Sequence, residues 1–266
     1  MNNQKKPLIT VVTVCYNAVN ELEKTMLSVL NQTYDNIEYI VIDGGSKDGT
    51  VDIIKKYADR LAYWVSEPDK GIYDAMNKGI KAATGEWINF MNAGDLFVKN
   101  TTLSEVFKAK QYSCDVIYGD TIKILSTGAY WSKHEPVDTL KTRLPFCHQS
   151  CFISQNAAMS NLYNTEYKIA ADYNQFYTIY KNGGRFKDIS VPISIFDNVE
   201  GLSSQYPDRL IKEYCRINES NAIPKLMKLS FVSIVKRILQ LVLSSGSYEM
   251  IMEKRKLKKV GERYEL

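Results

Sequence analysis

The stretch Gly85-Glu-Trp-Ile-Asn-Phe-Met-Asn-Ala-Gly-Asp95 is the one around which the rest of the chain is organised. Its apolar and aromatic run, Trp87 to Met91, predicts a short buried strand. The strand ends in a polar turn that carries the Asp95 carboxylate. Ligands of open α/β sheets bind beyond the carboxyl ends of the strands, so Asp95 is well placed to hold a cation or a polar ligand. Taken alone, Asp95 is better explained as the start of a turn or a helix cap.

The sequence before this stretch alternates between β-branched apolar runs and amphipathic segments. We expect strands at 8–14, 37–42, 61–65 and 87–91, separated by helices at 19–32, 51–58 and 71–83. This β-α-β-α-β-α-β order predicts a parallel, doubly wound sheet of the α/β class with right-handed crossovers.

The pattern changes after Asp95. We expect a helix at 101–110, a hairpin of 115–119 with 121–125, a strand at 146–153, a helix at 167–180, a strand pair within 186–195 and a helix at 207–220. These segments predict a smaller antiparallel element that completes one domain over residues 1–222.

Residues 223–266 are predicted to form a basic, amphipathic helical tail. From Pro224 onward the chain has ten Lys and Arg residues and four acidic residues. Apolar residues from Phe231 to Leu243 have helical spacing. A basic amphipathic helix can lie on an anionic membrane. The alternative is that its apolar face packs on the domain formed by residues 1–222 or on a second subunit.

Composition narrows the class of protein and its compartment. The 266 residues are 45% hydrophobic and carry a net charge of +4, which is too mild to indicate a nucleic-acid partner. Five cysteines without a Cys-x-x-Cys pair favour buried thiols in a reducing compartment. Since no apolar run is long enough to cross a bilayer, we expect a cytoplasmic protein, which could also be peripheral on the inner face of the membrane.

Polar clusters follow four successive predicted strands, at Tyr16-Asn17, Asp43, Glu67/Asp69 and Asp95. In a parallel sheet these clusters meet at one edge, which is then rich in carboxylates and poor in histidine. Such an edge suits Mg²⁺ or Mn²⁺ bridging a diphosphate, because both ions prefer oxygen ligands. The glycine-rich phosphate and dinucleotide loops that would otherwise hold a nucleotide are absent after the first strand.

Four ordered motifs resemble the family 2 glycosyltransferases with the GT-A fold. They are Val12-Thr-Val-Cys-Tyr-Asn17, Asp43-Gly-Gly-Ser-Lys-Asp-Gly-Thr50, Glu67-Pro-Asp-Lys-Gly-Ile-Tyr-Asp-Ala-Met-Asn-Lys-Gly79 and Gly85–Asp95. The similarity is strong over 8–95 and weaker to about 197. The Asn-Ala-Gly-Asp variant with a later His-Gln is similar to enzymes that build bacterial capsule, colanic acid or O-antigen.

The resemblance implies a role for each matching residue. Tyr16 would stack on the base, expected to be uracil, and Asp43 would accept a hydrogen bond from it. Asp172 would be the base that deprotonates the acceptor. The implied nucleotide site comprises Val14, Tyr16, Asp43, Gly44, Asp74, Lys78, Asn92 and Asp95, with Asp95 on the metal, and Glu67, His148, Gln149 and Ala171 would contact donor or acceptor.

Several of these residues also have a purely structural explanation. Gly44 could belong to a plain tight turn, and Asp74 with Lys78 could form an i,i+4 ion pair on a helix. Asp172 could stabilise a helix N-terminus, and His148 could be a structural histidine.

The metal motif departs from the usual Asp-x-Asp. Alignment on Met91 places Asn92 and Gly94 at the paired positions, which leaves Asp95 as the charged ligand for Mn²⁺ or Mg²⁺. The Gln-x-x-Arg-Trp motif of processive relatives is absent, so transfer of one sugar per encounter is expected.

The function expected from the resemblance is inverting transfer from a nucleotide-diphosphate sugar, with UDP favoured, to a glycan or lipid-linked acceptor. Two alternatives remain open. One is a catalytically weak nucleotide-binding subunit of a polysaccharide assembly complex. The other is a nucleotidyltransferase, which would need a basic, glycine-rich loop near the first strand. The chain could also form a homodimer.

Overall fold

A computed structural model describes residues 6–108, 110–125, 128–197, 205–242 and 261–264. The strands are β1 (Ile9–Cys15), β2 (Ile37–Asp43), β3 (Tyr63–Ser66), β4 (Trp87–Phe90), β5 (Leu96–Phe97), β6 (Val116–Leu125), β7 (Gly128–Ser132), β8 (Cys151–Ser154), β9 (Phe186–Asp197) and β10 (Arg263–Tyr264). The helices are α1 (Leu22–Leu30), α2 (Thr50–Lys56), α3 (Ile72–Ala82), α4 (Thr102–Phe107), α5 (Gln155–Ser160), α6 (Ala171–Lys181), α8 (Pro207–Ile217) and α9 (Ile223–Val242).

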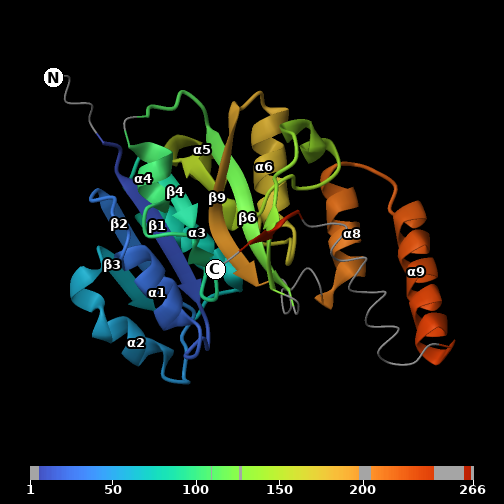
Figure 1. The fold of residues 1–266 in the computed structure, drawn as a ribbon, viewed down its shortest axis with the longest axis horizontal. Coiled ribbons are helices and arrows are strands. Elements are labelled where there is room, and N and C mark those ends of the chain that lie inside the picture. The colour runs from blue at the N-terminus through green and yellow to red at the C-terminus, as the bar shows by residue number, and fades with distance from the viewer. Residues whose placement is uncertain (1–5, 109, 126–127, 198–204, 243–260, 265–266) are drawn as a thin grey trace.

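The described strands form one sheet in the order β10-β7-β6-β8-β4-β1-β2-β3, with β9 beside β6 and β5 beside β9 (Figure 1). Strands β3, β2, β1 and β4 are parallel. Strand β8 is antiparallel to both β4 and β6, so β4 and β6 run in the same direction. The carboxyl ends of β1, β2, β4 and β6 therefore lie at one edge of the sheet.

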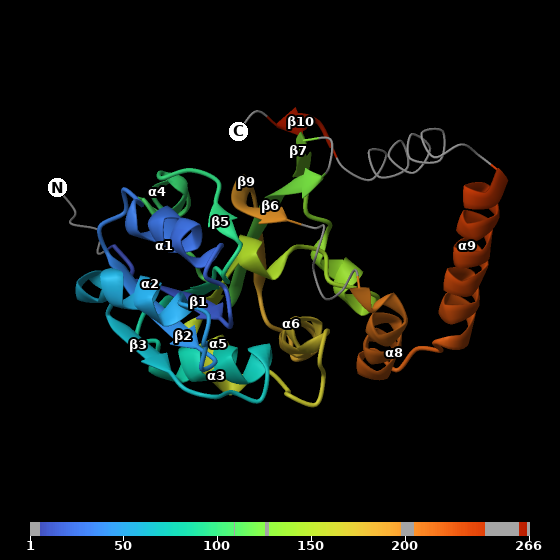
Figure 2. The same ribbon diagram turned by 90° about the horizontal axis from the view of Figure 1, so that it is seen from below.

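Helices cover both faces of the sheet, as Figure 2 shows. Because side chains alternate along a strand, Ile9 and Val11 of β1 pack in the core under α1 and α4, whereas Val12 and Val14 pack in the core under α3 and α6. Two-sided burial explains why β1, β2 and β4 are continuous apolar runs in the sequence. The predicted α/β fold, with a parallel, doubly wound first half, is confirmed.

The second half differs from the prediction in the placement of its strands. Residues 115–125 do not form a hairpin, because β6 runs unbroken through Gly119 and pairs antiparallel with β7 instead. Gly119 marks a bulge: a Cβ atom there would lie 2.5 Å from the carbonyl oxygen of Val191 in β9. Residues 186–197 likewise form the single strand β9.

Two further boundaries shift in the segment that carries the site. The strand predicted at 146–153 is reduced to β8, because His148–Ser150 forms a short 3₁₀ turn. The helix predicted from 167 begins at Ala171, as α6. The first shift places His148 and Gln149 in a turn, and the second places Asp172 in the first turn of α6.

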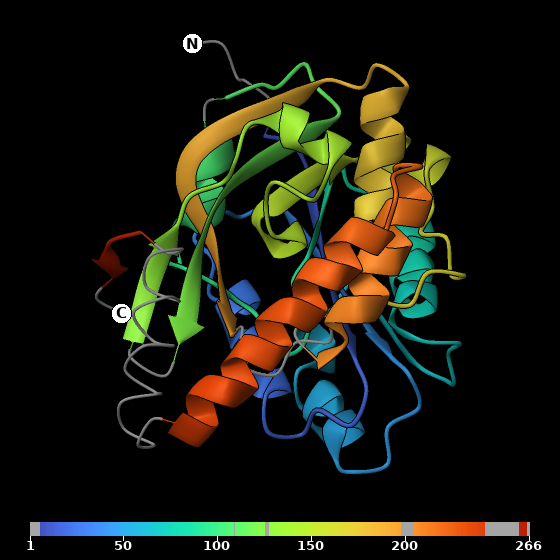
Figure 3. The ribbon, with the colours of Figure 1, turned by 90° about the vertical axis from the view of Figure 1, so that its right-hand side faces the viewer.

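Helices α8 and α9 extend the fold away from the sheet, and α9 lies outside α8 (Figure 3). The predicted tail helix is therefore present over 223–242. The basic cluster at 254–259 lies outside the described residues. Among the helices that the structure describes, none has the length and apolar character needed to cross a membrane.

Candidate active site

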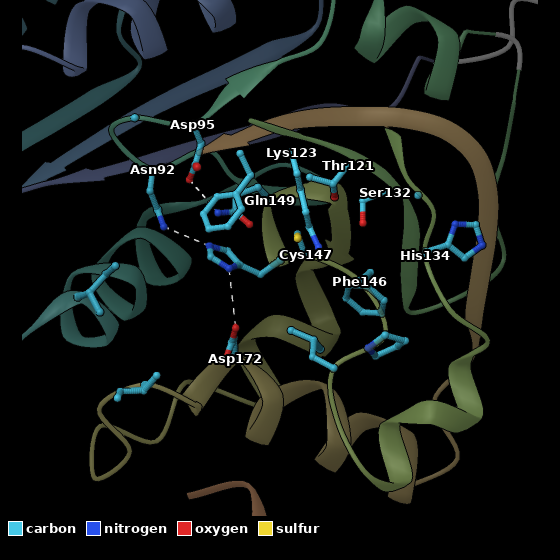
Figure 4. A pocket seen from close by; sticks show the side chains of 18 of the residues that line it. Asn92, Asp95, Thr121, Lys123, Ser132, His134, Phe146, Cys147, Gln149 and Asp172 are labelled. Carbon is cyan, nitrogen blue, oxygen red and sulfur yellow. Dashed lines mark hydrogen bonds and ion pairs between the residues drawn. The ribbon is translucent and has the colours of Figure 1, made fainter. Parts of the chain in front are cut away.

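A cavity of about 640 Å³ opens at the carboxyl-end edge of the sheet. Its walls come from the turn after β4, from β6 and β7, from the segment before β8 and from α3, α6 and α8 (Figure 4). Five residues predicted for the site line it together: Asn92, Asp95, His148, Gln149 and Asp172. Residues 80 positions apart in sequence therefore meet in one cavity.

Asp95 sits in the tight turn that ends β4. Its backbone N–H donates to the carbonyl oxygen of Asn92 over 2.9 Å. Gly94 adopts a φ of +99°, which favours glycine, and its N–H donates to Thr25 Oγ1. The Asp95 carboxylate is 6% exposed and accepts a hydrogen bond from Gln149 Nε2 over 3.0 Å. Burial raises its pKa to about 7, because this neutral contact does not replace the lost water.

His148 connects the β4 turn to α6. Its Nε2 lies 3.1 Å from Asn92 Nδ2, and its Nδ1 lies 3.8 Å from Asp172 Oδ2 (Figure 4). Burial lowers the pKa of His148 to about 4, so the ring is neutral near pH 7. Since Nδ2 of an amide is a donor, Nε2 must accept, and the ring proton is assigned to Nδ1, facing Asp172.

Asp172 lies in the first turn of α6 and faces the cavity. Burial raises its pKa to about 6, although the Tyr173 N–H donates to Oδ1 over 2.7 Å. The preceding loop is fixed by Glu213 of α8, whose carboxylate accepts from the backbone N–H groups of Lys168, Ile169 and Ala170. A carboxylate with this pKa is ionised near neutral pH and can still take up a proton.

Asp43 has a different environment, at the end of β2. It is fully buried, and its oxygens accept from the Ser46 hydroxyl, from Ser66 Oγ over 2.6 Å, and from the N–H groups of Gly45 and Ser46. Burial opposes ionisation, but these hydrogen bonds outweigh it and lower the pKa. In this structure Asp43 fixes the loop after β2, and a contact with a nucleotide base stays a prediction.

The loops after β1, β2 and β3 meet around Gly44. A Cβ atom there would clash with Asp69 Oδ2 and lie 3.2 Å from the ring of Tyr16, so a larger residue would have to displace these side chains. The Tyr16 ring is 64% exposed, which leaves a face free to stack on a planar ligand. Asp69 Oδ1 in turn accepts from the Gly71 N–H over 2.7 Å.

The i,i+4 ion pair considered for Asp74 and Lys78 does not form. Lys78 Nζ instead lies 2.8 Å from Glu67, and Asp74 accepts from the Lys70 N–H at the start of α3. The predicted residues that do not line this cavity are Val14, Tyr16, Asp43, Gly44, Glu67, Asp74, Lys78 and Ala171. Val14 is buried in the core and presents only its carbonyl oxygen, which accepts from the Ala93 N–H, and the Ala171 side chain is fully buried.

The structure also reveals site residues that the sequence did not single out. Asp120, 2% exposed, accepts from Trp131 Nε1 and from the N–H of His134, and its Oδ1 lies 2.7 Å from His134 Nδ1. His134 and Lys123 line the cavity. No local pattern marks these residues, because they meet only through the pairing of β6 with β7.

The turn after β4 contains oxygen atoms suited to a divalent cation. Among the described residues, Asn92 Oδ1 is a buried acceptor without a hydrogen-bond partner, and the Asp95 carboxylate is not paired with a cation. No three His, Cys, Asp or Glu residues in the described ranges form a metal-binding group. A hard cation here would complete its shell with diphosphate oxygens and water, as Mg²⁺ commonly does.

Comparison with known proteins then decides the family. The sequence pattern described as glycosyl transferase family 2 matches residues 10–190. The chain belongs to this family. It is 29% identical over 210 residues to the PGL/p-HBAD biosynthesis glycosyltransferase of Mycobacterium tuberculosis, covering 76% of this chain and 82% of that protein.

Solved structures share the fold of this glycosyltransferase at low sequence identity. Staphylococcus aureus TarS in complex with UDP has a TM-score of 0.63 at 18% identity, covering 92% of this chain and 69% of that one. The mannosyltransferase PcManGT of Pyrobaculum calidifontis, in complex with GDP-Man and Mn²⁺, has a TM-score of 0.65 at 16% identity, covering 95% and 81%. The expected GT-A fold is thereby confirmed.

Proposed function

We propose that this glycosyltransferase moves one sugar, with inversion, from a nucleotide-diphosphate sugar to a hydroxyl of a glycan or lipid-linked acceptor. The observation that carries the proposal is Asp172, a carboxylate with a pKa of about 6 that faces the cavity across from the β4 turn. An inverting transfer needs one such base, on the acceptor side of the sugar.

In the proposed reaction, the acceptor oxygen attacks C1 of the donor sugar while Asp172 takes the hydroxyl proton. The bond from C1 to the diphosphate breaks, and its electron pair leaves with the nucleoside diphosphate. Asp172 ends the step protonated. His148 supports the base as a positioning residue, because its Nδ1–H faces Asp172 Oδ2.

A divalent cation fits the turn after β4. Asp95 and Asn92 Oδ1 would hold it, and the cation would neutralise the charge of the diphosphate. Gln149 supports Asp95 through its hydrogen bond. The Mn²⁺ in the complex of PcManGT favours Mn²⁺ as the first ion to test, with Mg²⁺ second.

We infer that the nucleotide lies over the loops after β1 and β2, with UDP favoured. The exposed Tyr16 ring and the rigid loop held by Asp43 support this placement. The UDP in the TarS complex makes UDP the first nucleotide to test, and GDP the second. A role in bacterial surface polysaccharide synthesis rests on the motif resemblance alone.

The tail is proposed to contact an anionic membrane surface. Ile223, Met227 and Phe231 of α9 are spaced four residues apart and are 64–68% exposed, so they form an apolar stripe on one side of the helix. Lys228, next to Met227 in the chain, is exposed, whereas the Lys225 ammonium donates to Ser220 Oγ over 3.2 Å. This arrangement suits a helix that lies at a lipid interface.

Hydrolysis of a sugar nucleotide by the purified full chain is the direct test of the proposed activity. UDP-GlcNAc and GDP-Man are incubated with the protein and Mn²⁺, and release of UDP or GDP is measured against Asp172→Asn. Slow release that depends on Asp172 is expected, with water replacing the acceptor. Nucleotide binding without any release from a range of sugar nucleotides would instead favour a catalytically weak binding subunit.

A further inference from the structure

The cavity extends well beyond the residues that serve the proposed donor. Tyr16 and Asp43 follow β1 and β2, Asp95 follows β4, and Lys123 lies on β6. The sheet order β6-β8-β4-β1-β2 places Lys123 on the far side of β4 from the nucleotide loops. Figure 4 shows the same order across the cavity, with Gln149 between Asp95 and Lys123. This end of the cavity therefore lies away from the proposed nucleotide site.

Strand pairing brings three polar side chains to the face that lines this end. Thr121 and Lys123 are two residues apart on β6, so both side chains point to the same side of the sheet. Ser132 of β7 is the direct cross-strand partner of Thr121 and shares that side. In Figure 4 the ammonium of Lys123 and the hydroxyl of Ser132 are directed into the cavity.

Lys123 is a half-buried cation without an anionic partner. Among the described residues, the Lys123 ammonium makes no hydrogen bond or ion pair. Within the same described ranges, the Ser132 side chain makes no hydrogen bond. Glu135, which follows β7 and lines the same cavity, is paired with Arg143. The ammonium does act on Cys147, which lines the same wall: burial raises the pKa of that thiol, and Lys123 partly opposes the increase.

We propose that Lys123 and Ser132 bind an anionic group of the acceptor, either a phosphate ester or a carboxylate. The inference rests on the proposed transferase function and adds the chemical class of the acceptor. An ammonium and a hydroxyl directed into one cavity can donate together to a single anion, and charge-assisted hydrogen bonds are about twice as strong as neutral ones. Leu210 and Tyr214 of α8 add an apolar wall to the same cavity, which suits an acceptor that also carries apolar groups.

The test uses the full chain saturated with UDP and Mn²⁺, so that the donor site is filled. Hexyl phosphate, methyl glucuronide and neutral hexyl glucoside are titrated into wild type, Lys123→Ala and Ser132→Ala by calorimetry. Lys187→Ala is the matched control, since Lys187 is an exposed lysine of β9 that is not among the residues lining this cavity.

We expect at least one anionic probe to bind the wild type without displacing UDP. Loss of one charged hydrogen bond predicts at least about tenfold weaker binding to Lys123→Ala, with Lys187→Ala unchanged. Tighter binding of hexyl phosphate would identify a phosphate-bearing acceptor, and tighter binding of the glucuronide an acidic sugar.

Three results would overturn the proposal: no anion binding, equal affinity in Lys123→Ala, or competition between the anionic probe and UDP. Competition would assign Lys123 to the donor diphosphate instead. UDP binding and sugar-nucleotide hydrolysis, measured on the same samples, test the transferase function separately. Failure of those two with intact Lys123-dependent anion binding would reject the function and leave the anion site standing.

Discussion

Replacing Asp172 by Asn separates a catalytic base from a carboxylate that only supports its helix. The change keeps the shape of the side chain, and Asn Oδ1 can still accept from the Tyr173 N–H. Asn cannot take a proton from an acceptor. Because general-base catalysis contributes about 10²- to 10⁴-fold, we expect sugar transfer or donor hydrolysis to fall by that order.

The same substitution is expected to stabilise the protein at alkaline pH. The pKa of Asp172 is about 6 when folded, against an ordinary value of 3.8. A difference of about two pKa units means that burial of the ionised form costs about 3 kcal/mol. The side chain is 17% exposed, so water reduces this cost, and a gain of about 1–3 kcal/mol at pH 8 is expected for the variant.

The pH dependence follows from the direction of the pKa change. Between pH 4 and 6 the folded wild type retains a proton that the unfolded chain has lost, so its stability decreases as the pH rises through this range. The Asn variant has no such decrease. The wild type and the Asn variant should therefore have similar free energies of unfolding in urea at pH 4 and differ most above pH 7. Wild-type kcat/KM should rise with pH through about 6.

Urea unfolding from pH 4 to 8.5, nucleotide binding and turnover are measured on the same preparations. Asp208→Asn is the matched control, because Asp208 is an exposed acid in the first turn of α8. The Asp208→Asn variant should lose less than about 1 kcal/mol of unfolding free energy and keep full activity. Near-normal turnover in Asp172→Asn, or destabilisation like that of a helix-terminal acid, would refute the assignment of Asp172 as the base.

Three further predictions concern the metal, the nucleotide loops and the tail. UDP with Mn²⁺ should raise the free energy of unfolding of the wild type by about 2.7 kcal/mol at a hundredfold excess over Kd. The Asp95→Ala variant should lose the part of this stabilisation that depends on Mn²⁺. Nucleotide affinity that survives EDTA in the wild type would contradict this prediction. Gly44→Ala should weaken UDP binding roughly tenfold, because the new Cβ displaces Asp69, and calorimetry giving an unchanged Kd would reject that loop as the nucleotide site. The protein should float with anionic vesicles at low salt, because each basic residue near the surface adds about 1 kcal/mol to membrane binding. The double variant Met227→Ser with Phe231→Ser should show less flotation. Absence of wild-type flotation would favour packing of α9 on protein.

The sequence alone was sufficient for the fold of the first half and for one edge of the site. Buried parallel strands are continuous apolar runs, and each ends at a polar turn, so strand order along the chain predicts that Asp43 and Asp95 share an edge. The second half was harder to predict. Gly119 resembles a turn in sequence, yet it is a bulge that lets β9 approach β6.

What only the tertiary structure decided is the set of partners around each polar residue. The sequence motifs pointed to Asp172 and His148 individually. Their contact depends on how α6 packs beside the turn before β8. The same packing buries both groups, which raises the pKa of Asp172 and lowers the pKa of His148. Lys123 and Ser132 come together through the register of β6 and β7. Local periodicity specifies which face of an element is buried, because it is a property of neighbouring residues. Hydrogen-bond partners and desolvation depend on residues distant in sequence, so they are determined only when the chain packs.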